Sequence, residues 1–393
     1  MRALVWHGTQ DIRCETVPDP QIEDERDAII KVTVCAICGS DLHLYDHFMP
    51  GMERGDVMGH EFMGEVVETG RGVNGALRKG ERVVIPFTII CGECDQCKRG
   101  FFSVCERSNR NKHVAAKAFG HTTAGLFGYT HITGGYPGGQ AEYVRVPYAD
   151  VGPCKIPKTM DLDDAVLLTD VVPTGYQAAE MGGIQRGDTV VVFGAGPVGI
   201  MAARCAWLFG AGRVIVIDHV EYRLDFARRY CPAEVYNFRS IGDPVVFLKK
   251  TTDSLGADVC IDAVGGDAAG SALHTLMGTK LKLEGGSAVA LHWAINSVKK
   301  GGIVSIVGVY GPTGNLIPIG NVLNKGITIR ANQASVKRLL PKLIAHIEAG
   351  RLNPKELITH KVPLEEAADA YHLFSAKLDD CIKPVLVPPT ARA

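Results

Sequence analysis

The chain has 393 residues, of which 46% are hydrophobic and 22% are charged, and its formal net charge is −1. This length exceeds that of a typical single domain, so we expect two domains with sizeable hydrophobic cores. The near-neutral charge argues against a nucleic-acid partner. No apolar run approaches the roughly 18 residues that cross a bilayer, which argues against a membrane partner.

The thiol content and the first residues indicate a cellular compartment. Residues 1–7 are too polar for the apolar region of a secretory signal. Twelve cysteines in so large a chain therefore predict reduced thiols rather than a disulfide framework. We expect a cytoplasmic protein.

Short β-rich runs dominate the first 150 residues. We expect strands at residues 28–34, 64–68 and 81–85, separated by turns that contain glycine. Strands without intervening helical patterns predict a β-rich or α+β domain. Between these strands, Cys38 and His60 could each donate one ligand to zinc, although a lone cysteine or histidine is more often a core residue.

Four cysteines are concentrated in the lobe at residues 91–105. Two CxxC spacings and one further cysteine let a single loop converge on one tetrahedral ion, which predicts zinc bound by Cys91, Cys94, Cys97 and Cys105. Four protein ligands leave no open position for a substrate, so this zinc would be structural. The alternative is a CxxC redox pair, which would leave two of the four cysteines unexplained.

The polar segment 107–137 follows this lobe. Its histidines, His113, His121 and His131, are interpreted as surface or loop residues rather than metal ligands. The segment could still shape a substrate pocket.

The pattern changes near residue 170 to alternating strands and helices. Residues 189–193 form a short apolar run typical of a strand covered on both faces. Further strands are expected at 213–217, 257–262 and 302–307, with helices up to residue 209 and at 221–230. This alternation predicts a doubly wound parallel sheet. Two more helices are expected near 336–349 and 364–375.

A glycine motif, Gly-Ala-Gly-Pro-Val-Gly at residues 194–199, directly follows the first of these strands and opens a helix. In this context the motif predicts a dinucleotide-binding turn, whose residues are Gly194, Gly196, Pro197, Val198 and Gly199. The first glycine makes the tight turn, the second lets the backbone approach a pyrophosphate, and the third allows close helix packing. The helix N-terminus would hold the phosphates.

Asp218 ends the second strand, 19 residues after Gly199. A carboxylate there accepts hydrogen bonds from a ribose diol and repels a 2′-phosphate, which favours NAD over NADP. Arg223 could reach the same ribose and soften this preference. The alternative is a glycine-rich turn without a ligand and a solvated aspartate.

Together these motifs resemble the zinc-containing medium-chain alcohol dehydrogenases over essentially the whole chain. The residues that carry the resemblance are Cys38-Gly-Ser-Asp, Gly59-His-Glu, the four-cysteine lobe, and the glycine turn followed by Asp218. The resemblance implies an α/β protein with a β-rich GroES-like catalytic domain at residues 1–170 and 331–393. It implies a Rossmann coenzyme domain at 171–330, with the active site in the cleft. It also implies two zinc ions per chain, NAD, and a homodimer or homotetramer.

The third ligand of the family's catalytic zinc falls on Asp170, at a position that is often cysteine. This aspartate, with Gly-Gly-Gln-Ala-Glu-Tyr-Val at 138–144 and Val-Pro-Tyr-Ala-Asp at 146–150, looks most like the glutathione-independent formaldehyde dehydrogenases and aldehyde dismutases. A carboxylate keeps the single negative charge of a thiolate but is a harder donor.

The resemblance assigns further roles by position. Cys38, His60 and Asp170 would hold the catalytic zinc and leave one position for water or substrate. Ser40 would take the substrate proton and pass it through the cofactor ribose to His43. Thr174 would touch the nicotinamide and Val264 would line the cofactor cleft.

Three charged residues near the predicted catalytic zinc have more open roles. Glu61 would either approach the zinc during ligand exchange or be a buried, paired carboxylate. Asp41 would accept from the imidazole of His60. The family's basic residue after the first zinc cysteine is Gly39 here, so Lys383 becomes a candidate for the pyrophosphate contact.

The expected reaction is zinc-dependent, NAD-linked oxidation of a small alcohol or of a hydrated aldehyde such as formaldehyde. The alternatives are an aldehyde dismutase that retains NAD, and a polyol dehydrogenase. A zinc-free quinone reductase or a non-catalytic zinc- and nucleotide-binding protein is disfavoured, because the catalytic zinc ligands and Ser40 are all present.

Overall fold

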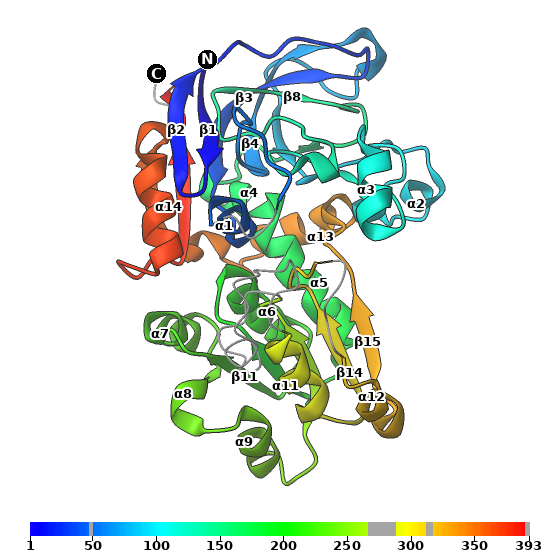
Figure 1. Cartoon of the computed structure of the whole chain (residues 1–393), viewed down its shortest axis with the longest axis vertical. Coiled ribbons are helices and arrows are strands. Elements are labelled where there is room, and N and C mark those ends of the chain that lie inside the picture. The colour runs from blue at the N-terminus through cyan, green and yellow to red at the C-terminus, as the bar shows by residue number, and fades with distance from the viewer. Residues whose placement is uncertain (47–49, 266–287, 312–316, 390–393) are drawn as a thin grey trace. The chain divides into compact units, whose positions relative to one another are not determined.

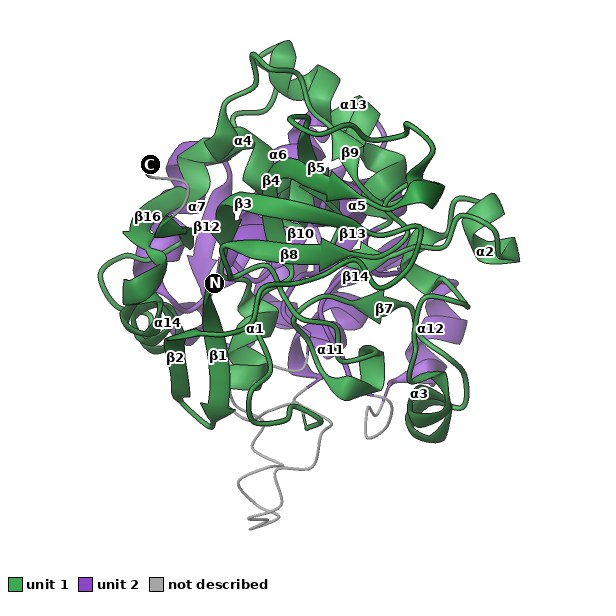
Figure 2. Cartoon of the chain, turned by 90° about the horizontal axis from the view of Figure 1, so that it is seen from above, with its two compact units in different colours: residues 1–173, 335–393 green, residues 174–334 purple. Residues whose placement is uncertain are grey.

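The computed structural model describes residues 1–46, 50–265, 288–311 and 317–389. The chain forms two compact units, the first from Met1–Pro173 with Ser335–Ala393 and the second from Thr174–Ala334 (Figure 2). The chain thus leaves the first unit, builds the second and then returns to the first. The sequence placed these boundaries a few residues earlier, after residues 170 and 330.

Antiparallel strands and short helices build the first unit (Figure 1). Its strands are β1 (Arg2–Gly8), β2 (Asp11–Thr16), β3 (Ala28–Ala36), β4 (Glu61–Thr69), β5 (Arg82–Ile85), β6 (Thr88–Ile89), β7 (Gly125–Leu126), β8 (Tyr143–Val146), β9 (Cys154–Lys155), β16 (Ile358–Pro363) and β17 (Lys383–Val387). Its helices are α1 (Gly39–Tyr45), α2 (Asp95–Lys98), α3 (Lys112–Phe119), α4 (Leu162–Val166), α13 (Val336–Glu348) and α14 (Ala367–Ala376). Its short 3₁₀ turns are Arg71–Val73, Phe102–Val104, His131–Thr133, Leu167–Thr169, Pro354–Leu357 and Leu364–Glu366.

The main sheet of the first unit has the order β16-β17-β3-β4-β5-β9, and β8 also pairs with β3. The β-branched run of β3 is buried along most of its length, which suits a central strand. Of the pairs in this sheet, only β16 with β17 is parallel; the others are antiparallel. The returning segment therefore supplies two strands of the sheet that the first 150 residues begin.

The core of this unit lies on the sheet and under the C-terminal helix. Ile30 and Phe62 of the sheet pack in one cluster with Tyr371 and Phe374 of α14. Helix α14 packs against β2, β16 and β17, and Figure 1 shows it beside β2. The C-terminal segment is thus an integral part of the core.

The second unit is a parallel sheet with helices. Its strands are β10 (Thr189–Phe193), β11 (Arg213–Asp218), β12 (Glu234–Asn237), β13 (Ala257–Asp262), β14 (Val298–Ile306) and β15 (Thr328–Ala331), and its helices are α6 (Pro197–Leu208), α7 (Glu221–Tyr230), α8 (Phe238–Ile241), α9 (Pro244–Thr251), α11 (Val289–Ser297) and α12 (Ile319–Lys325). Helix α5 (Val171–Gly182) leads into it.

The sheet of the second unit has the order β12-β11-β10-β13-β14-β15, and every printed pair is parallel. The order reverses at β10, which is the switch point at which doubly wound folds bind ligands. Helix α6 follows β10 directly and packs on β10 and β11. The predicted fold class, a β-rich domain plus a doubly wound parallel sheet, is confirmed. In the described parts of the chain, no helix has the length and apolarity needed to cross a bilayer.

Candidate active site

The structure brings the sulfurs of the four-cysteine lobe together. Cys91, Cys94, Cys97 and Cys105 are buried, and their sulfur atoms all lie within 4.8 Å of one another. Cys91 Sγ lies 4.0 Å from Cys97 Sγ, and Cys94 Sγ lies 3.9 Å from Cys105 Sγ. A tetrahedral zinc with Zn–S bonds of about 2.3 Å separates its sulfur ligands by about 3.8 Å. The lobe therefore fits one zinc ion held by all four cysteines.

Backbone N–H groups point at these sulfurs. The N–H groups of Glu93 and Cys94 donate to Cys91 Sγ, and the N–H of Cys91 donates to Cys105 Sγ, each at 3.4 Å. Burial opposes ionisation of the Cys105 thiol, but the Ser108 hydroxyl and nearby backbone N–H groups outweigh it and lower the pKa to about 7. At Cys105 these contacts favour thiolate, the form that binds a metal, whereas burial raises the pKa of the Cys91 and Cys97 thiols. The convergence of four sulfurs favours zinc over an isolated redox pair.

A second donor cluster combines three kinds of ligand atom. Cys38, His60, Glu61 and Asp170 are buried, and their ligand atoms lie within 4.8 Å of one another. Asp170 Oδ2 lies 3.5 Å from both Cys38 Sγ and His60 Nε2. Cys38 is the N-cap of α1, His60 precedes β4, and Asp170 lies between the 3₁₀ turn Leu167–Thr169 and α5. Residues from three separate segments therefore converge on one point.

The chemistry of this cluster fits zinc. A thiolate, an imidazole and a carboxylate are all zinc ligands, and three of them around one ion leave a fourth position open. Burial and the neighbouring carboxylates of Asp170 and Glu61 raise the pKa of the Cys38 thiol to about 11. Several buried anionic groups at one point repel one another, and a divalent cation would offset that repulsion.

The imidazole of His60 is held on both sides. Its Nδ1 lies 3.0 Å from Asp41 Oδ1, as expected for a carboxylate that orients a histidine ligand. Its Nε2 faces Asp170 and lies 3.3 Å from Ser40 Oγ. His43 lies three residues after Ser40 on α1, and therefore on the same side of that helix.

Behind Asp41 lie two residues to which the sequence analysis gave no role. Gln140 Nε2 donates to Asp41 Oδ2 at 3.4 Å, and the hydroxyl of Tyr371 donates to Gln140 Oε1 at 2.9 Å. Both side chains are fully buried. Tyr371 is 231 positions from Gln140, and no local sequence signal could have paired them.

Lys383 does not have the surroundings expected of a phosphate ligand. Its side chain is fully buried on β17, and Nζ lies 2.7 Å from both carboxylate oxygens of Glu61 and donates to the carbonyl of Ile37 at 2.9 Å. The suggestion that Lys383 contacts pyrophosphate is therefore wrong, because the side chain faces the core. Glu61 is a buried, paired carboxylate in this structure, and one of its oxygens also lies within 4.8 Å of the donor atoms of Cys38, His60 and Asp170, so its approach to the zinc stays a prediction.

Aromatic rings enclose the His60 side of the cluster. The ring of Tyr129 lies 6.1 Å from that of His60 at 90°, and the ring of Phe87 lies 6.2 Å from it at 74°. Tyr129 belongs to segment 107–137, which therefore contributes to the surroundings of the donors. His113 and His121 of this segment are exposed, and His131 Nε2 lies 3.1 Å from Asp56, so all three lie outside the donor clusters.

The glycine motif forms the turn between β10 and α6. Gly194 has a φ of +99°, which favours glycine, and a Cβ on Gly199 would lie 1.9 Å from the carbonyl oxygen of Gly194. Gly196 is the N-cap of α6, and Pro197 begins the helix, followed by Val198. The free N–H groups and positive dipole of this 12-residue helix are available to a phosphate.

Three other predicted cofactor residues border this turn. The side chain of Val264 lies 2.7 Å from the position of a Cβ on Gly194, and the guanidinium of Arg223 lies 4.0 Å from that on Gly196. Asp218 Oδ2 accepts from the N–H of Ala195 at 2.6 Å, which ties the end of β11 to the turn. Thr174 is buried on α5, whose next residue, Gly175, packs against α6.

Asp218 is ionised in this setting. Burial opposes the charge, but hydrogen bonds from the His219 side chain and from the backbone N–H groups of Ala195 and His219 outweigh it and lower the pKa to about 2. The second unit therefore presents a fixed negative charge where a Rossmann fold binds the ribose of its cofactor.

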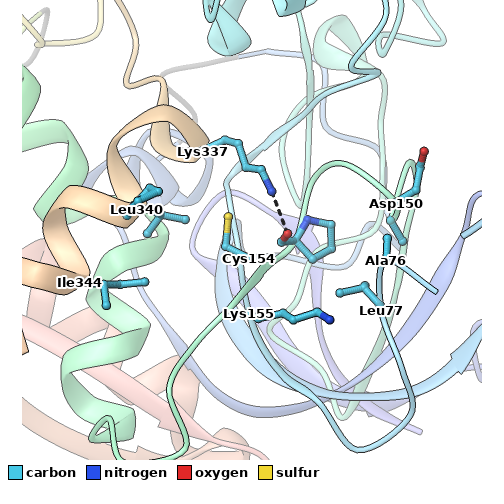
Figure 3. A pocket seen from close by; sticks show the side chains of 11 residues that line it. Ala76, Leu77, Asp150, Cys154, Lys155, Lys337, Leu340 and Ile344 are labelled. Carbon is cyan, nitrogen blue, oxygen red and sulfur yellow. Dashed lines mark hydrogen bonds between the residues drawn. The ribbon is translucent and has the colours of Figure 1, made fainter. Parts of the chain in front are cut away.

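A separate cavity of about 420 Å³ lies beside α13 (Figure 3). Leu77, Leu340 and Ile344 give it apolar walls, and Lys337 Nζ donates to the carbonyl of Pro153 at 3.0 Å. None of its lining residues belongs to a donor cluster, so this cavity is not the candidate active site.

Comparisons with known proteins give the class. Residues 24–158 match the alcohol dehydrogenase GroES-like domain, and residues 197–279 match the zinc-binding dehydrogenase domain. The uncharacterized zinc-type alcohol dehydrogenase-like protein AdhB of Bacillus subtilis is 45% identical over 99% of this chain and 100% of its own length. The chain belongs to the zinc-type medium-chain alcohol dehydrogenase family.

Two further relatives extend this comparison. The formaldehyde dismutase of Pseudomonas putida is 33% identical over 95% of this chain and 94% of its own length. Among solved structures, alcohol dehydrogenase TADH from Thermus sp. ATN1 is 33% identical and superposes with a TM-score of 0.84, covering 99% of this chain and 100% of that one. The predicted family and its GroES-like and Rossmann domains are confirmed.

Proposed function

We propose that this protein is an NAD-dependent zinc dehydrogenase that oxidises small primary alcohols or hydrated small aldehydes such as formaldehyde. The observation that carries the proposal is the convergence of Cys38, His60 and Asp170 at one buried point, with Ser40 against His60. The same chain carries a nucleotide turn closed by an ionised aspartate.

The chain's own residues would divide the work of the reaction. Cys38, His60 and Asp170 would hold a zinc ion, which when bound acts as a Lewis acid that polarises an alcohol or carbonyl oxygen. Ser40 would accept the substrate's hydroxyl proton and pass it by way of the cofactor ribose to His43, which would release it to solvent. Asp41, whose Oδ1 lies 3.0 Å from His60 Nδ1, would keep the His60 ring in one orientation.

The other unit would bind the cofactor. The N–H groups at the start of α6 would hold the pyrophosphate. The negative charge of Asp218 would accept the ribose diol and repel a 2′-phosphate, which supports NAD over NADP. Arg223 would contact the same ribose, Thr174 the nicotinamide, and Val264 would line the cofactor site.

A second zinc in the four-cysteine lobe would be structural, because its four ligands leave no position for a substrate. The twelve free thiols support a reducing compartment such as the cytoplasm. Family resemblance supports a homodimer or homotetramer.

Substrate class is tested by NADH production with formaldehyde, short and aromatic alcohols, and polyols, each with and without glutathione. We expect turnover of formaldehyde or short alcohols that does not need glutathione. Activity confined to polyols, or with NADP alone, would contradict the proposal.

The metal assignment is tested by Asp170→Ala. We expect loss of turnover and of one of two zinc ions per chain, while NAD binding persists. Asp163→Ala is the control, because Asp163 makes a surface ion pair with Lys361 at 2.6 Å. Retained activity in Asp170→Ala would refute the assignment.

An aldehyde dismutase is the second candidate, supported by the identity with the Pseudomonas putida formaldehyde dismutase. A dismutase regenerates NAD by reducing a second aldehyde, so it needs no added cofactor once loaded. Cofactor that survives gel filtration, with aldehyde turnover in the absence of added NAD, would select this function over the dehydrogenase.

A further inference from the structure

A line of buried polar contacts leads from the C-terminal helix to His60. The Tyr371 hydroxyl on α14 donates to Gln140 Oε1 at 2.9 Å, and Gln140 Nε2 donates to Asp41 Oδ2 at 3.4 Å. Asp41 Oδ1 lies 3.0 Å from His60 Nδ1. All four residues are at most 4% exposed, so water does not compete for these contacts.

The acceptors around Gln140 determine which way its amide points. Its Nε2 also donates to the carbonyl of Ala36 at 3.1 Å. If the amide were turned over, its oxygen would face two acceptors, the Ala36 carbonyl and the Asp41 carboxylate. The Tyr371 hydroxyl stabilises the observed orientation, because it supplies a donor to the opposite end of the amide.

Tyr371 is a reliable donor in this position. Burial, followed by the charge of Asp41, raises the pKa of its hydroxyl well above the ordinary value, so the group stays protonated. The ring is also fixed, because it packs in the core of the first unit with its centroid 5.5 Å from that of Tyr45.

Gln140 has no room to move away. A Cβ on Gly59 would lie 2.3 Å from Gln140 Cγ, and Gly59 has a φ of +95°. The backbone of Gln140 is held by its N–H to the carbonyl of Met58 at 3.0 Å and by the N–H of Leu4 to its carbonyl at 2.8 Å. The residue before His60 is thus a glycine because the Gln140 side chain passes directly against it.

We propose that Gln140 and Tyr371 are positioning residues for the His60 metal ligand. Gln140, oriented by Tyr371, holds the Asp41 carboxylate; Asp41 in turn holds Nδ1–H of His60, so that Nε2 presents its lone pair to the metal. The inference rests on the proposed function, in which Cys38, His60 and Asp170 bind zinc. It adds that the returning C-terminal segment controls how firmly they do so.

The predicted consequence is faster loss of the metal when this line of contacts is cut. Removing an outer-shell partner of a zinc-bound histidine costs about 10–100-fold in metal affinity. Gln140 touches the Asp41 carboxylate directly, and we expect Gln140→Met to lose the metal about tenfold faster than the wild type. Tyr371 acts one step further out, and we expect Tyr371→Phe to lose the metal about threefold faster than the wild type, or more.

The experiment measures metal release in the full-length protein. Cobalt(II) replaces zinc at the Cys38–His60–Asp170 site, while zinc stays in the four-cysteine lobe. The cobalt absorption band is then followed as a chelator removes the ion. The samples are the wild type, Tyr371→Phe, Gln140→Met, the double variant and Tyr45→Phe. Tyr45 is a matched control, because its ring packs against Tyr371 but lies outside the line of contacts.

The double variant distinguishes an effect of Tyr371 that passes through Gln140 from a simple loss of packing. If Tyr371 acts through Gln140, the double variant releases cobalt at the Gln140→Met rate within about twofold, because coupled residues are not additive. Tyr45→Phe keeps the wild-type rate.

The inference is overturned if Tyr371→Phe releases cobalt at the wild-type rate, or if the two single effects multiply in the double variant. A wild-type protein that takes up no cobalt at this site would overturn the proposed function, and this inference with it. The two kinds of failure are distinguishable, because release rates can be compared only when the wild-type site holds cobalt.

Discussion

Lys383 and Glu61 are 322 positions apart in the sequence, yet Lys383 Nζ lies 2.7 Å from the carboxylate, and both side chains are fully buried. The pair joins the last strand of the first unit to the first residue of β4, directly after His60. Burial raises the pKa of the Glu61 carboxyl, and the lysine opposes this rise. The ammonium group of Lys383 therefore favours the charged form of this carboxyl next to the metal ligands, against the effect of burial.

Lys383→Met should destabilise the protein by about 3–5 kcal/mol, because it leaves an uncompensated charge in the core. The double variant Lys383→Met/Glu61→Gln should recover much of this loss, since it removes both charges. Urea unfolding of the metal-loaded protein measures the effect. Lys361→Met is the control, because Lys361 is about half exposed and its ion pair with Asp163 should be worth no more than about 1 kcal/mol. If Lys383→Met and Lys361→Met were equally stable, the buried Lys383–Glu61 pair would contribute no more to stability than the surface pair.

Cys97→Ser should remove one zinc ion per chain and expose the lobe at residues 91–105 to proteases, because a structural zinc site contributes folding energy directly. The metal at Cys38, His60 and Asp170 should stay. Elemental analysis and limited proteolysis are the measurements. Cys14→Ser, at a partly buried cysteine outside both clusters, should change neither. Two zinc ions in Cys97→Ser would argue against a four-sulfur site.

Asp218→Asn should change the acid stability of the protein. The native carboxyl has its pKa lowered from 3.8 to about 2, so its ionisation stabilises the fold above pH 3.8, and this contribution is lost as the pH falls towards 2. The size is about 2 kcal/mol. We expect the asparagine variant to be less stable than the wild type by this amount at pH 7, and the gap to close between pH 4 and pH 2.

Denaturant unfolding at a series of pH values measures this gap. Asp225→Asn is the control, because Asp225 is exposed on α7, where it pairs with Arg228. A gap that stays constant down to pH 2 would mean that the Asp218 charge is not what stabilises the turn.

Gly199→Ala should abolish NAD binding while both zinc ions stay bound, because the new Cβ would lie 1.9 Å from the carbonyl of Gly194 and force the turn apart. Gly320→Ala is the control: the position is on α12, and an added Cβ meets nothing within 4 Å. That change should be neutral or stabilise by up to about 1 kcal/mol. Binding of NAD measured by calorimetry tests both, and wild-type affinity in Gly199→Ala would mean that the turn does not bind the cofactor.

Local patterns were enough to predict four of the six described strands of the second unit, and the helices α6 and α7. The apolar run at 189–193 and the helical segment at 221–230 appear as β10 and α7 with the same bounds. Strand β14 begins at Val298 rather than near 302, because Val298 already pairs with Ala257 of β13; the register then shifts across the two lysines and the glycine pair at 299–302, whose composition is typical of a turn. Here the pairing with β13 outweighs local preference.

The candidate site could be predicted only where its residues lie in short motifs. Cys38, His60 and Asp170 were found because each belongs to a recognisable stretch, and resemblance to a family connected them. The roles of Lys383, Gln140 and Tyr371 depend on contacts across 231 to 322 positions, which leave no periodicity or spacing to read. A buried lysine and an exposed one look the same in a sequence.

The return of the chain to its first unit sets an order of events during synthesis. While the ribosome still holds α14 and β17, the nascent protein already has Cys38, His60 and Asp170, but Glu61 lacks Lys383 and Gln140 lacks Tyr371. A polypeptide truncated before α14 therefore carries every ligand for the ion but lacks both Tyr371 and Lys383. We therefore expect the first unit to hold its metal firmly only once the segment that carries α14 and β17 has joined it.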